Sequence, residues 1–295
     1  MWQAMDGNYN AENVYFSEDL ITTVNVGNIE LSDGKATIPS SGKNLKEVFE
    51  AIFVKEEAPE VEYPSIILTF SNAKDYEVGT EVEPSYIVTF NKGKYEFGPD
   101  TAISVEEWEI TDSNGNILST EKGSFDTFTV ADGTNYSITA TANYNDGAMP
   151  LTNLGNDCPE AQILKSSISA MKDGLKGYRK TFYGTFENKD ELTSDLIRSL
   201  YSTNKALSNG SVVSVNIPEG AKRIVFAYPA ELNDLSSVTD TNAFGTEILS
   251  GFTKILLDVE GNNHYQAKSY KVYYLDYARS NNVNNSYTFT IKEEG

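Results

Sequence analysis

Residues 136–142 have the sequence Tyr-Ser-Ile-Thr-Ala-Thr-Ala, in which apolar and hydroxylated side chains alternate. Because successive side chains of a strand point to opposite faces, this stretch places its apolar residues on one face and its hydroxyls on the other. Such a stretch is typical of a half-buried strand in an antiparallel sheet. Residues 136–142 therefore predict a β fold.

The same alternation recurs before this strand, within residues 65–152. Further strands are predicted at residues 66–70, 86–90, 105–111 and 125–130, separated by turns that contain Gly, Asn or Asp. About seven short strands in a segment of this length suggest an immunoglobulin-like β-sandwich, with Trp108 as its central core ring. No cysteine pair accompanies Trp108, so the pattern suggests the architecture alone.

Residues 161–295 predict a second β-sandwich that carries one helix. Its strands are expected at residues 178–186, 212–217, 223–228, 254–259, 269–275 and 287–291. The helix is expected over residues 188–200, with Asn188 as the N-cap and Glu191 three residues later. The expected buried stripe of this helix consists of Leu192, Leu196, Ile197 and Leu200.

The N-terminal module is predicted to be a small α+β module. Strand-like stretches cover residues 20–26, 28–31 and 36–38, and a helical pattern follows. The apolar positions of that pattern recur at helical spacing and form one stripe, which consists of Leu45, Val48, Phe49, Ile52 and Phe53. One short helix cannot bury this stripe alone, so it packs on the preceding hairpin or docks on another subunit. The stripe is the candidate contact for oligomerisation and anchoring.

Two polar segments divide the chain into modules. The segment before residue 65 combines like charges with Pro59 and Pro64, which predicts an extended, solvated linker. A second connector is expected around residues 153–159. The expected organisation is an N-terminal module over residues 1–57, a linker over 58–64, an immunoglobulin-like sandwich over 65–160 and a C-terminal sandwich over 161–295. The predicted fold class is mostly β.

The charge of the chain limits its partners. It holds 43 acidic and 23 basic residues among 295, which gives a net charge of −20. Such a charge repels the phosphates of nucleic acids and anionic lipids, so we expect no nucleic acid partner. No stretch approaches the roughly 18 apolar residues of a membrane span, and the first residues lack the basic and apolar regions of a signal peptide. We expect no membrane insertion, and folding in the cytoplasm.

The sequence is poor in the groups that carry catalysis. His264 is the single histidine and Cys158 the single cysteine, and neither a phosphate-binding glycine loop nor a nucleophile elbow occurs. The polar sequence around His264 predicts a solvated loop, and Cys158 has no partner for an internal disulfide. We therefore predict that the protein is not an enzyme and has no catalytic, cofactor-binding or metal-binding residues.

Two acidic segments offer other interpretations. The glutamates that flank Trp108 are Glu106, Glu107 and Glu109. Acids beside an aromatic ring can hold or hydrolyse a sugar, although a buried Trp108 flanked by exposed acids is the simpler interpretation. Residues 112–116, Asp-Ser-Asn-Gly-Asn, are superficially similar to a calcium-binding loop. The pair Asn114-Gly115 instead favours a hairpin with a type I′ turn.

Residues 270–277 form a tyrosine-rich strand with the sequence Tyr-Lys-Val-Tyr-Tyr-Leu-Asp-Tyr. One alternate set of its side chains should face the core. The others could present rings to a ligand, because tyrosine combines a flat apolar face with a hydroxyl. Tyr273 and Tyr277 are the candidates for surface recognition.

The order of these parts resembles that of phage virion structural proteins. The stretches that carry the resemblance are residues 44–53 (NLKEVFEAIF), 67–79, 95–98, 124–130, 177–179 and 182–184. They are similar in particular to the head-fibre proteins of crAss-like phages, tailed phages that infect gut bacteria. The resemblance implies a homo-oligomeric appendage with its N-terminal module on the virion and its C-terminal module outward. It transfers no functional residues, because these stretches are scaffold patterns.

The function that the resemblance implies is that of a non-enzymatic head fibre on the virion surface. Its expected partners are one or two further copies of itself, in a dimer or a trimer, and capsid or other virion proteins bound through the N-terminal module. A glycan of the host surface is a further candidate partner. A tail-attached fibre that recognises host glycan is the alternative, and a carboxylate-dependent glycan depolymerase is a second one.

Overall fold

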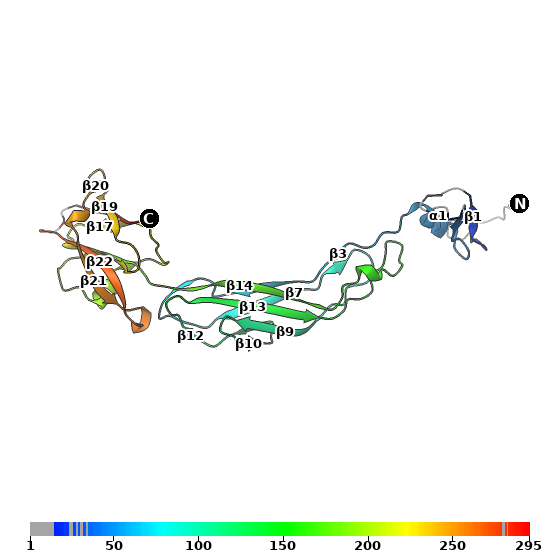
Figure 1. The fold of residues 1–295 in the computed structure, drawn as a ribbon, viewed down its shortest axis with the longest axis horizontal. Coiled ribbons are helices and arrows are strands. Elements are labelled where there is room, and N and C mark those ends of the chain that lie inside the picture. Colours follow the sequence, from blue (N-terminus) through cyan, green and yellow to red (C-terminus); the bar gives the residue numbers. More distant parts are fainter. Residues whose placement is uncertain are drawn as a thin grey trace. The chain divides into compact units, whose positions relative to one another are not determined.

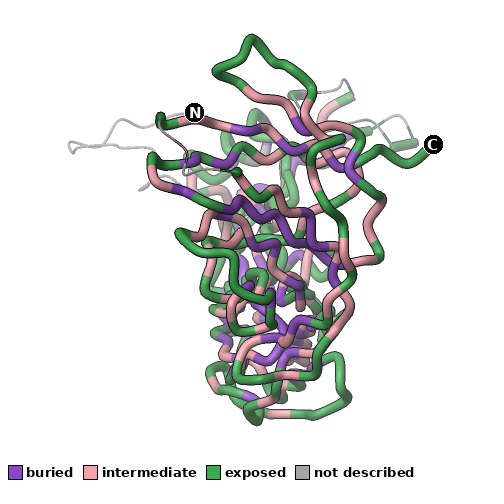
Figure 2. The backbone as a smooth tube through the Cα atoms, turned by 90° about the vertical axis from the view of Figure 1, so that its left-hand side faces the viewer, coloured by how far each residue is buried: buried purple, intermediate pink, exposed green. Residues whose placement is uncertain are grey.

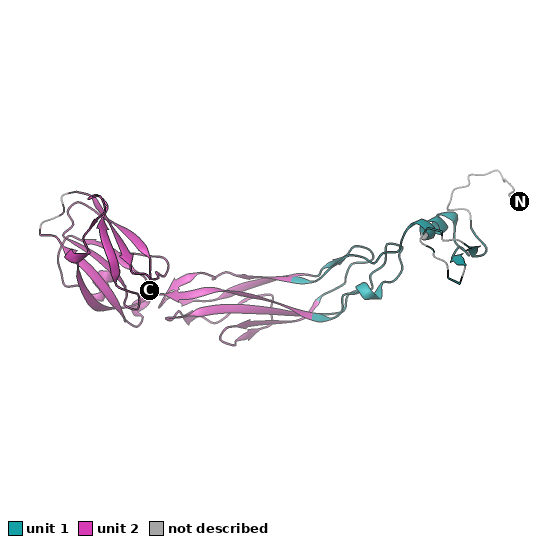
Figure 3. Cartoon of the chain, turned by 45° about the horizontal axis from the view of Figure 1, so that its top comes forward, with its two compact units in different colours: residues 1–65, 92–104, 144–166 teal, residues 66–91, 105–143, 167–295 magenta. Residues whose placement is uncertain are grey.

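The structure, a computed structural model, describes residues 15–23, 26–27, 29, 32–33, 35–278, 281 and 283–295. It is mostly β, as predicted, with several sheets (Figure 1). The chain forms two compact units (Figure 3). Unit 1 comprises residues 1–65, 92–104 and 144–166, and unit 2 comprises residues 66–91, 105–143 and 167–295.

Unit 1 begins with a small hairpin and a helix. β1 (Leu20–Thr22) pairs antiparallel with β2 (Ala36–Ile38), and α1 (Leu45–Phe53) follows. The helix begins at a capping box, in which Asn44 Oδ1 accepts from the Glu47 amide at 2.9 Å and Glu47 Oε2 accepts from the Asn44 amide at 2.7 Å. The predicted helix is confirmed. Of the predicted strand at residues 28–31, only residue 29 lies within the described residues.

The rest of unit 1 contains the predicted linker, part of which forms a strand. β3 (Val61–Glu62) pairs antiparallel with β8 (Lys94–Tyr95), and both Pro59 and Pro64 are buried. The Tyr95 hydroxyl accepts a hydrogen bond from the Ile163 amide at 3.0 Å, just after the 3-10 helix η1 (Pro159–Ala161). Within residues 58–64, a short strand therefore pairs with residues far along the sequence, while Ala58, Glu60, Glu62 and Tyr63 are exposed.

The first sheets of unit 2, which we call the central sheets, form a sandwich-like arrangement. Their orders are β10-β9-β13-β14-β5, β11-β7-β4 and β12-β6. The strands are β4 (Ser65–Phe70), β5 (Asp75–Glu77), β6 (Glu81–Val82), β7 (Ser85–Asn91), β9 (Val105–Asp112), β10 (Ile117–Leu118), β11 (Lys122–Ser124), β12 (Phe128–Thr129), β13 (Asn135–Tyr144) and β14 (Ser166–Tyr178). Their core includes Tyr86, Ile110 and Ile138. Trp108, the predicted central ring, is only partly buried at its margin.

The strand that predicted the fold lies within β13. Its residues Tyr136, Ile138 and Ala140 are buried, and the hydroxylated residues between them are partly exposed, as the alternation predicts. Buried, intermediate and exposed residues follow one another along many segments of the chain (Figure 2). The next strand, β14, lies beside β13 in the same sheet. The central sheets therefore continue to Tyr178, beyond the boundary expected at residue 160.

The remaining strands of unit 2, which we call the C-terminal sheets, form a five-stranded sheet in the order β16-β15-β18-β22-β21 and a four-stranded sheet in the order β17-β23-β19-β20. The first contains β15 (Phe182–Phe186), β16 (Tyr201–Ser202), β18 (Arg223–Pro229), β21 (Thr253–Val259) and β22 (Lys268–Asp276). The second contains β17 (Val212–Ile217), β19 (Leu235–Asp240), β20 (Thr246–Glu247) and β23 (Asn285–Ile291). Two further 3-10 helices are η2 (Leu249–Gly251) and η3 (Asn262–His264).

Both faces of the five-stranded sheet are covered, which explains why every residue of β18 is buried. One face of β18 contributes Phe226 to a core shared with the four-stranded sheet. The other face contributes Val225 to a cluster that contains α2 (Ser194–Arg198). The predicted covering helix therefore exists, but it is shorter than residues 188–200. It begins at Thr193, whose hydroxyl accepts from the Leu196 amide at 3.3 Å, and not at Asn188.

Candidate functional sites

The structure divides the predicted apolar stripe of α1 between two roles. Val48 and Ile52 are buried and pack with Ile38 of β2 in the small core of this module. Phe49 and Phe53, in contrast, are 48% and 70% exposed. The hairpin therefore covers only half of the stripe, because its two short strands offer too little surface for both rows. Leu45, at the start of the helix, is partly buried.

The two exposed phenylalanines form a pair on the outer side of α1. Phe49 and Phe53 are one helical turn apart, and their ring centroids are 6.0 Å apart at an interplanar angle of 37°. Glu47 and Glu50 are exposed on the same helix. An aromatic pair with charged residues beside it is typical of the apolar centre and polar rim of a protein contact. This arrangement can bind another protein surface and offers no groups for chemistry.

The two tyrosines predicted for surface recognition are less exposed than expected. Tyr273 is 5% exposed, and its ring stacks on that of Tyr228 at 6.1 Å. Tyr277 is partly buried, and its hydroxyl donates to the Tyr287 hydroxyl at 3.1 Å. Burial, followed by that hydrogen bond, raises the pKa of Tyr277. Tyr273 cannot present its ring to a surface ligand, because its side of β22 faces the core between the two C-terminal sheets.

A groove in the C-terminal sheets presents other tyrosines instead. Tyr201 is 79% exposed and lies on β16, directly opposite the partly buried Tyr183 of β15. The two tyrosines line a groove of about 970 Å³. Its other lining residues are Gly184, Thr185, Ser214, Val215, Asn216, Ile217, Pro218, Asn242, Asn284, Asn285 and Ser286. The sequence gives no signal for this groove, because segments up to about a hundred residues apart build it.

The acids around Trp108 do not form an evident catalytic pair. Glu106, Glu107 and Glu109 are exposed, and the Asn143 side chain donates to Glu107 Oε2 at 3.2 Å. Trp108 packs edge-on against Phe90, with ring centroids 6.3 Å apart. The exposed acids agree with the simpler interpretation, although Trp108 is less buried than that interpretation expected.

The segment similar to a calcium loop is a hairpin turn. Thr111 pairs with Ile117, and Gly115 has a φ of +86°. The Asp112 and Asn116 backbones are hydrogen-bonded, and Asn114 does not have a positive φ. The hairpin prediction is confirmed, but the turn is a three-residue loop that ends on a left-handed glycine, and the predicted type I′ turn is wrong.

Hydrogen bonds satisfy the buried Asp112 carboxylate within this hairpin. Its Oδ1 accepts from the Asn114 and Asn116 amides at 2.9 and 2.8 Å, and its Oδ2 accepts from the Tyr136 hydroxyl at 2.8 Å. Burial acts to raise the pKa of Asp112, but the hydrogen bonds outweigh it, so the pKa lies below its ordinary value. Burial and the bond to Asp112 raise the pKa of Tyr136. Asp112 therefore organises the turn without the need for a cation.

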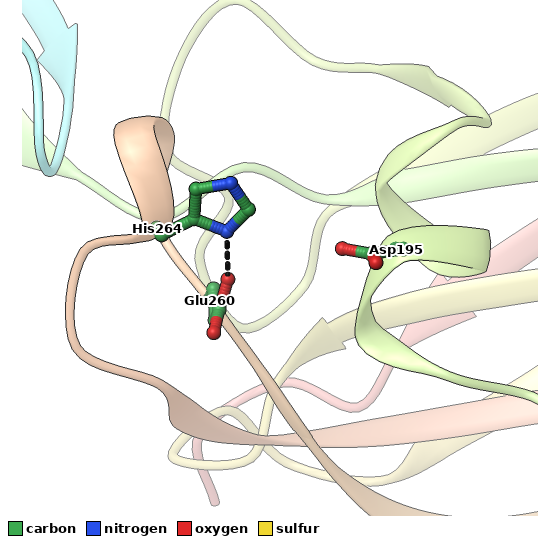
Figure 4. A group of neighbouring side chains, drawn as sticks. All are labelled: Asp195, Glu260 and His264. Carbon is green, nitrogen blue, oxygen red and sulfur yellow. Dashed lines mark hydrogen bonds and ion pairs between the residues drawn. The ribbon is translucent and has the colours of Figure 1, made fainter.

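His264 lies on the surface beside two carboxylates. Its Nδ1 is 2.7 Å from Glu260 Oε2, and the ligand atoms of Asp195, Glu260 and His264 lie within 4.8 Å of one another (Figure 4). Hydrogen bonds fix the Glu260 backbone, whose amide donates to Ser194 Oγ at 3.0 Å and whose carbonyl accepts from Arg198 Nη1 at 2.7 Å. One imidazole nitrogen and two carboxylate oxygens could bind a divalent cation such as zinc. His264 is exposed, as predicted, but the sequence did not reveal its acidic neighbours.

Cys158 is buried. Burial, with the nearby Glu160, raises the pKa of its thiol. The thiolate is the reactive form of cysteine, and a raised pKa keeps the thiol of Cys158 protonated at neutral pH, which disfavours a role as a nucleophile.

Comparisons with known proteins identify no relative. No family model matches the chain, and neither a curated protein nor a solved structure matches it. Among the described residues, no helix is long and apolar enough to cross a membrane.

Proposed function

We propose that the chain is a non-enzymatic structural protein of a phage particle, a homo-oligomeric head fibre that binds the capsid through residues 1–57. The exposed Phe49–Phe53 pair on α1 carries the assembly part of this proposal. The resemblance of the sequence to phage head fibres supplies the setting. In this proposal the central sheets are an immunoglobulin-like spacer, and the C-terminal sheets form the outward sandwich.

The energetics of α1 favour its contact with a second copy of the chain. Burial of a phenylalanine side chain contributes roughly 1.5–3 kcal/mol, so a partner that covers Phe49 and Phe53 gains a few kcal/mol. The capping box orders the helix before any partner arrives, which lowers the entropic cost of association. In a symmetric dimer or trimer the same helix serves every subunit. We therefore assign the phenylalanine pair to self-association.

The distribution of charge suggests a separate role for the rest of the N-terminal half. Residues 1–160 hold 28 acidic and 8 basic residues, whereas residues 161–295 hold 15 of each. An acidic surface favours a basic partner and steers its approach. The capsid surface that receives residues 1–57 is accordingly expected to be basic, and its attachment should weaken at high salt.

Particle assembly tests the proposal. The double variant Phe49→Ser/Phe53→Ser should be absent from purified particles of the phage that encodes the protein, or strongly reduced in them. Phe244→Ser is the matched control, because Phe244 is a fully exposed phenylalanine in the turn between β19 and β20 and its loss should leave incorporation unchanged. Normal incorporation of the double variant would contradict the role of the Phe49–Phe53 pair in assembly.

A tail-attached fibre that recognises host glycan is the alternative, and the groove beside Tyr201 favours it. The two proposals differ in where the protein lies on the particle. Gold-labelled antibody against residues 161–295, viewed by electron microscopy, should mark the head in the first case and the tail in the second.

A further inference from the structure

A row of four aromatic residues crosses the five-stranded C-terminal sheet. Tyr201 is opposite Tyr183, Tyr183 is opposite Phe226, and Phe226 is opposite Tyr273. Because directly opposite residues of neighbouring strands point to the same face, all four rings lie on the face that packs against the four-stranded sheet. Their exposure differs greatly: Tyr273 and Phe226 are buried, Tyr183 is partly buried, and Tyr201 is largely exposed.

The exposure of these four rings increases toward the edges of the two sheets. β16 is the edge strand of the five-stranded sheet, and β17 is an edge strand of the four-stranded sheet. The side chain of Tyr201 lies beyond the cover of the second sheet, so the aromatic face opens into the groove. Residues 214–217 of β17 line the opposite side. An edge strand has unpaired backbone amides and carbonyls, so β17 offers hydrogen-bonding groups along the groove.

The lining of the groove selects against most ligands. None of the described residues that line it is charged, although 22% of the residues in the chain are. A phosphate or carboxylate ligand would find no counter-charge there. A purely apolar ligand would desolvate the exposed amide of Asn216 without replacing its hydrogen bonds to water. The groove suits a neutral ligand that has both apolar faces and many hydroxyls.

We propose that this groove binds a neutral oligosaccharide. The C–H face of a sugar ring stacks on the exposed ring of Tyr201, with Tyr183 beside it. Sugar hydroxyls, which both donate and accept, pair with the exposed amide of Asn216 and with the edge of β17. The groove volume of about 970 Å³ lies at the upper end of the range for ligand pockets, which fits a chain of several sugar units. This inference rests on the proposed function for its biological meaning, since it gives the outward part of the fibre a class of ligand.

Calorimetry on the purified full-length chain tests the inference directly. The probes are three linear neutral hexasaccharides: one built from glucose, one from mannose and one from galactose. At least one should bind, and its affinity should hardly change between about 0.05 and about 0.5 M salt, because no charge is involved. Tyr201→Ala should weaken that affinity by about tenfold through the loss of stacking, and Tyr201→Phe should retain it.

The control is Tyr63→Ala, since Tyr63 is 67% exposed and lies in unit 1. It should bind like the wild type, and circular dichroism should show that both alanine variants are folded. The inference is overturned if none of the three hexasaccharides binds, if Tyr201→Ala binds as tightly as the wild type, or if Tyr63→Ala weakens binding equally. None of these results would affect the particle test, which depends on Phe49 and Phe53.

Discussion

Tyr183 and Tyr201 are directly opposite each other on β15 and β16, and the same face of that sheet continues through Phe226 into the core. One row of rings therefore serves packing at one end and exposes a tyrosine at the other. Whether a ring of this row is buried or exposed depends on how far the four-stranded sheet extends over it. The residue type does not decide this, because both tyrosines and phenylalanine occur in the row.

The two ends of this row should differ sharply in their effect on stability. Phe226 is fully buried and stacks on Phe289 at a centroid distance of 4.6 Å. Phe226→Ala should lower the free energy of unfolding of the C-terminal sheets by about 3–5 kcal/mol, whereas Tyr201→Ala should change it by less than about 0.5 kcal/mol. Urea unfolding followed by circular dichroism measures both. Equal losses would show that Tyr201 is packed in solution.

Substitutions on the two faces of α1 should also differ in their effect on stability. Val48→Ala removes a buried side chain and should destabilise the N-terminal module by about 2 kcal/mol, whereas Phe49→Ala leaves its core intact. Because the chain has several parts, unfolding of the whole chain does not isolate this module. Limited proteolysis does, provided that the wild type and both variants are compared as monomers at high dilution, because self-association would itself protect the module. Under these conditions cleavage within residues 15–55 should accelerate for Val48→Ala and not for Phe49→Ala. Faster cleavage of the Phe49→Ala monomer would place Phe49 in the module's own core.

Asp112 should contribute to the acid sensitivity of the central sheets. Its pKa is lowered in the folded state, so its stabilisation is complete above the unfolded pKa of about 3.9 and is lost as the pH falls through the lower folded value. Asp112→Asn should lower stability at pH 7 by about 1–3 kcal/mol, with the gap to wild type closing below about pH 3. Urea unfolding between these pH values checks this. A gap that stays constant with pH would contradict the assigned role of the ionised carboxylate.

The cluster of Asp195, Glu260 and His264 should not require a cation for folding. Two backbone hydrogen bonds of Glu260 already hold the loop in place: its amide donates to Ser194 Oγ, and its carbonyl accepts from Arg198 Nη1. Treatment with EDTA should therefore leave the thermal unfolding midpoint unchanged. A fall of several degrees that is restored by zinc, and is absent in His264→Ala, would show that a bound cation belongs to the native fold.

Local patterns in the sequence predicted many of the longer strands, but β14 and β19 were not predicted. The helix α1 and the hairpin at residues 112–116 have partners nearby in the chain, so short-range geometry determines them. The alternation at residues 136–142 identified β13 from its own side-chain pattern, although its neighbours β9 and β14 lie farther away in the sequence. Contacts from distant segments produced the corrections. Val61 pairs with Tyr95, and β14 extends the central sheets beyond residue 160.

The candidate sites were harder to predict for the same reason. Periodicity showed that one side of α1 is apolar, but not that Val48 would be covered and Phe49 exposed, because the size of the hairpin decides this. Tyr273 and Tyr201 are chemically identical, and only the tertiary fold buries one and exposes the other. The groove has no signature in the sequence.

The mass of the free protein in solution tests the central claim of self-assembly most directly. Sedimentation equilibrium should give two or three times the chain mass of 32.5 kDa for the wild type and for Phe244→Ser. It should give a single chain mass for Phe49→Ser/Phe53→Ser, because the exposed pair on α1 holds the subunits together. A monomeric wild type, or a double variant with the same mass as an oligomeric wild type, would contradict the account.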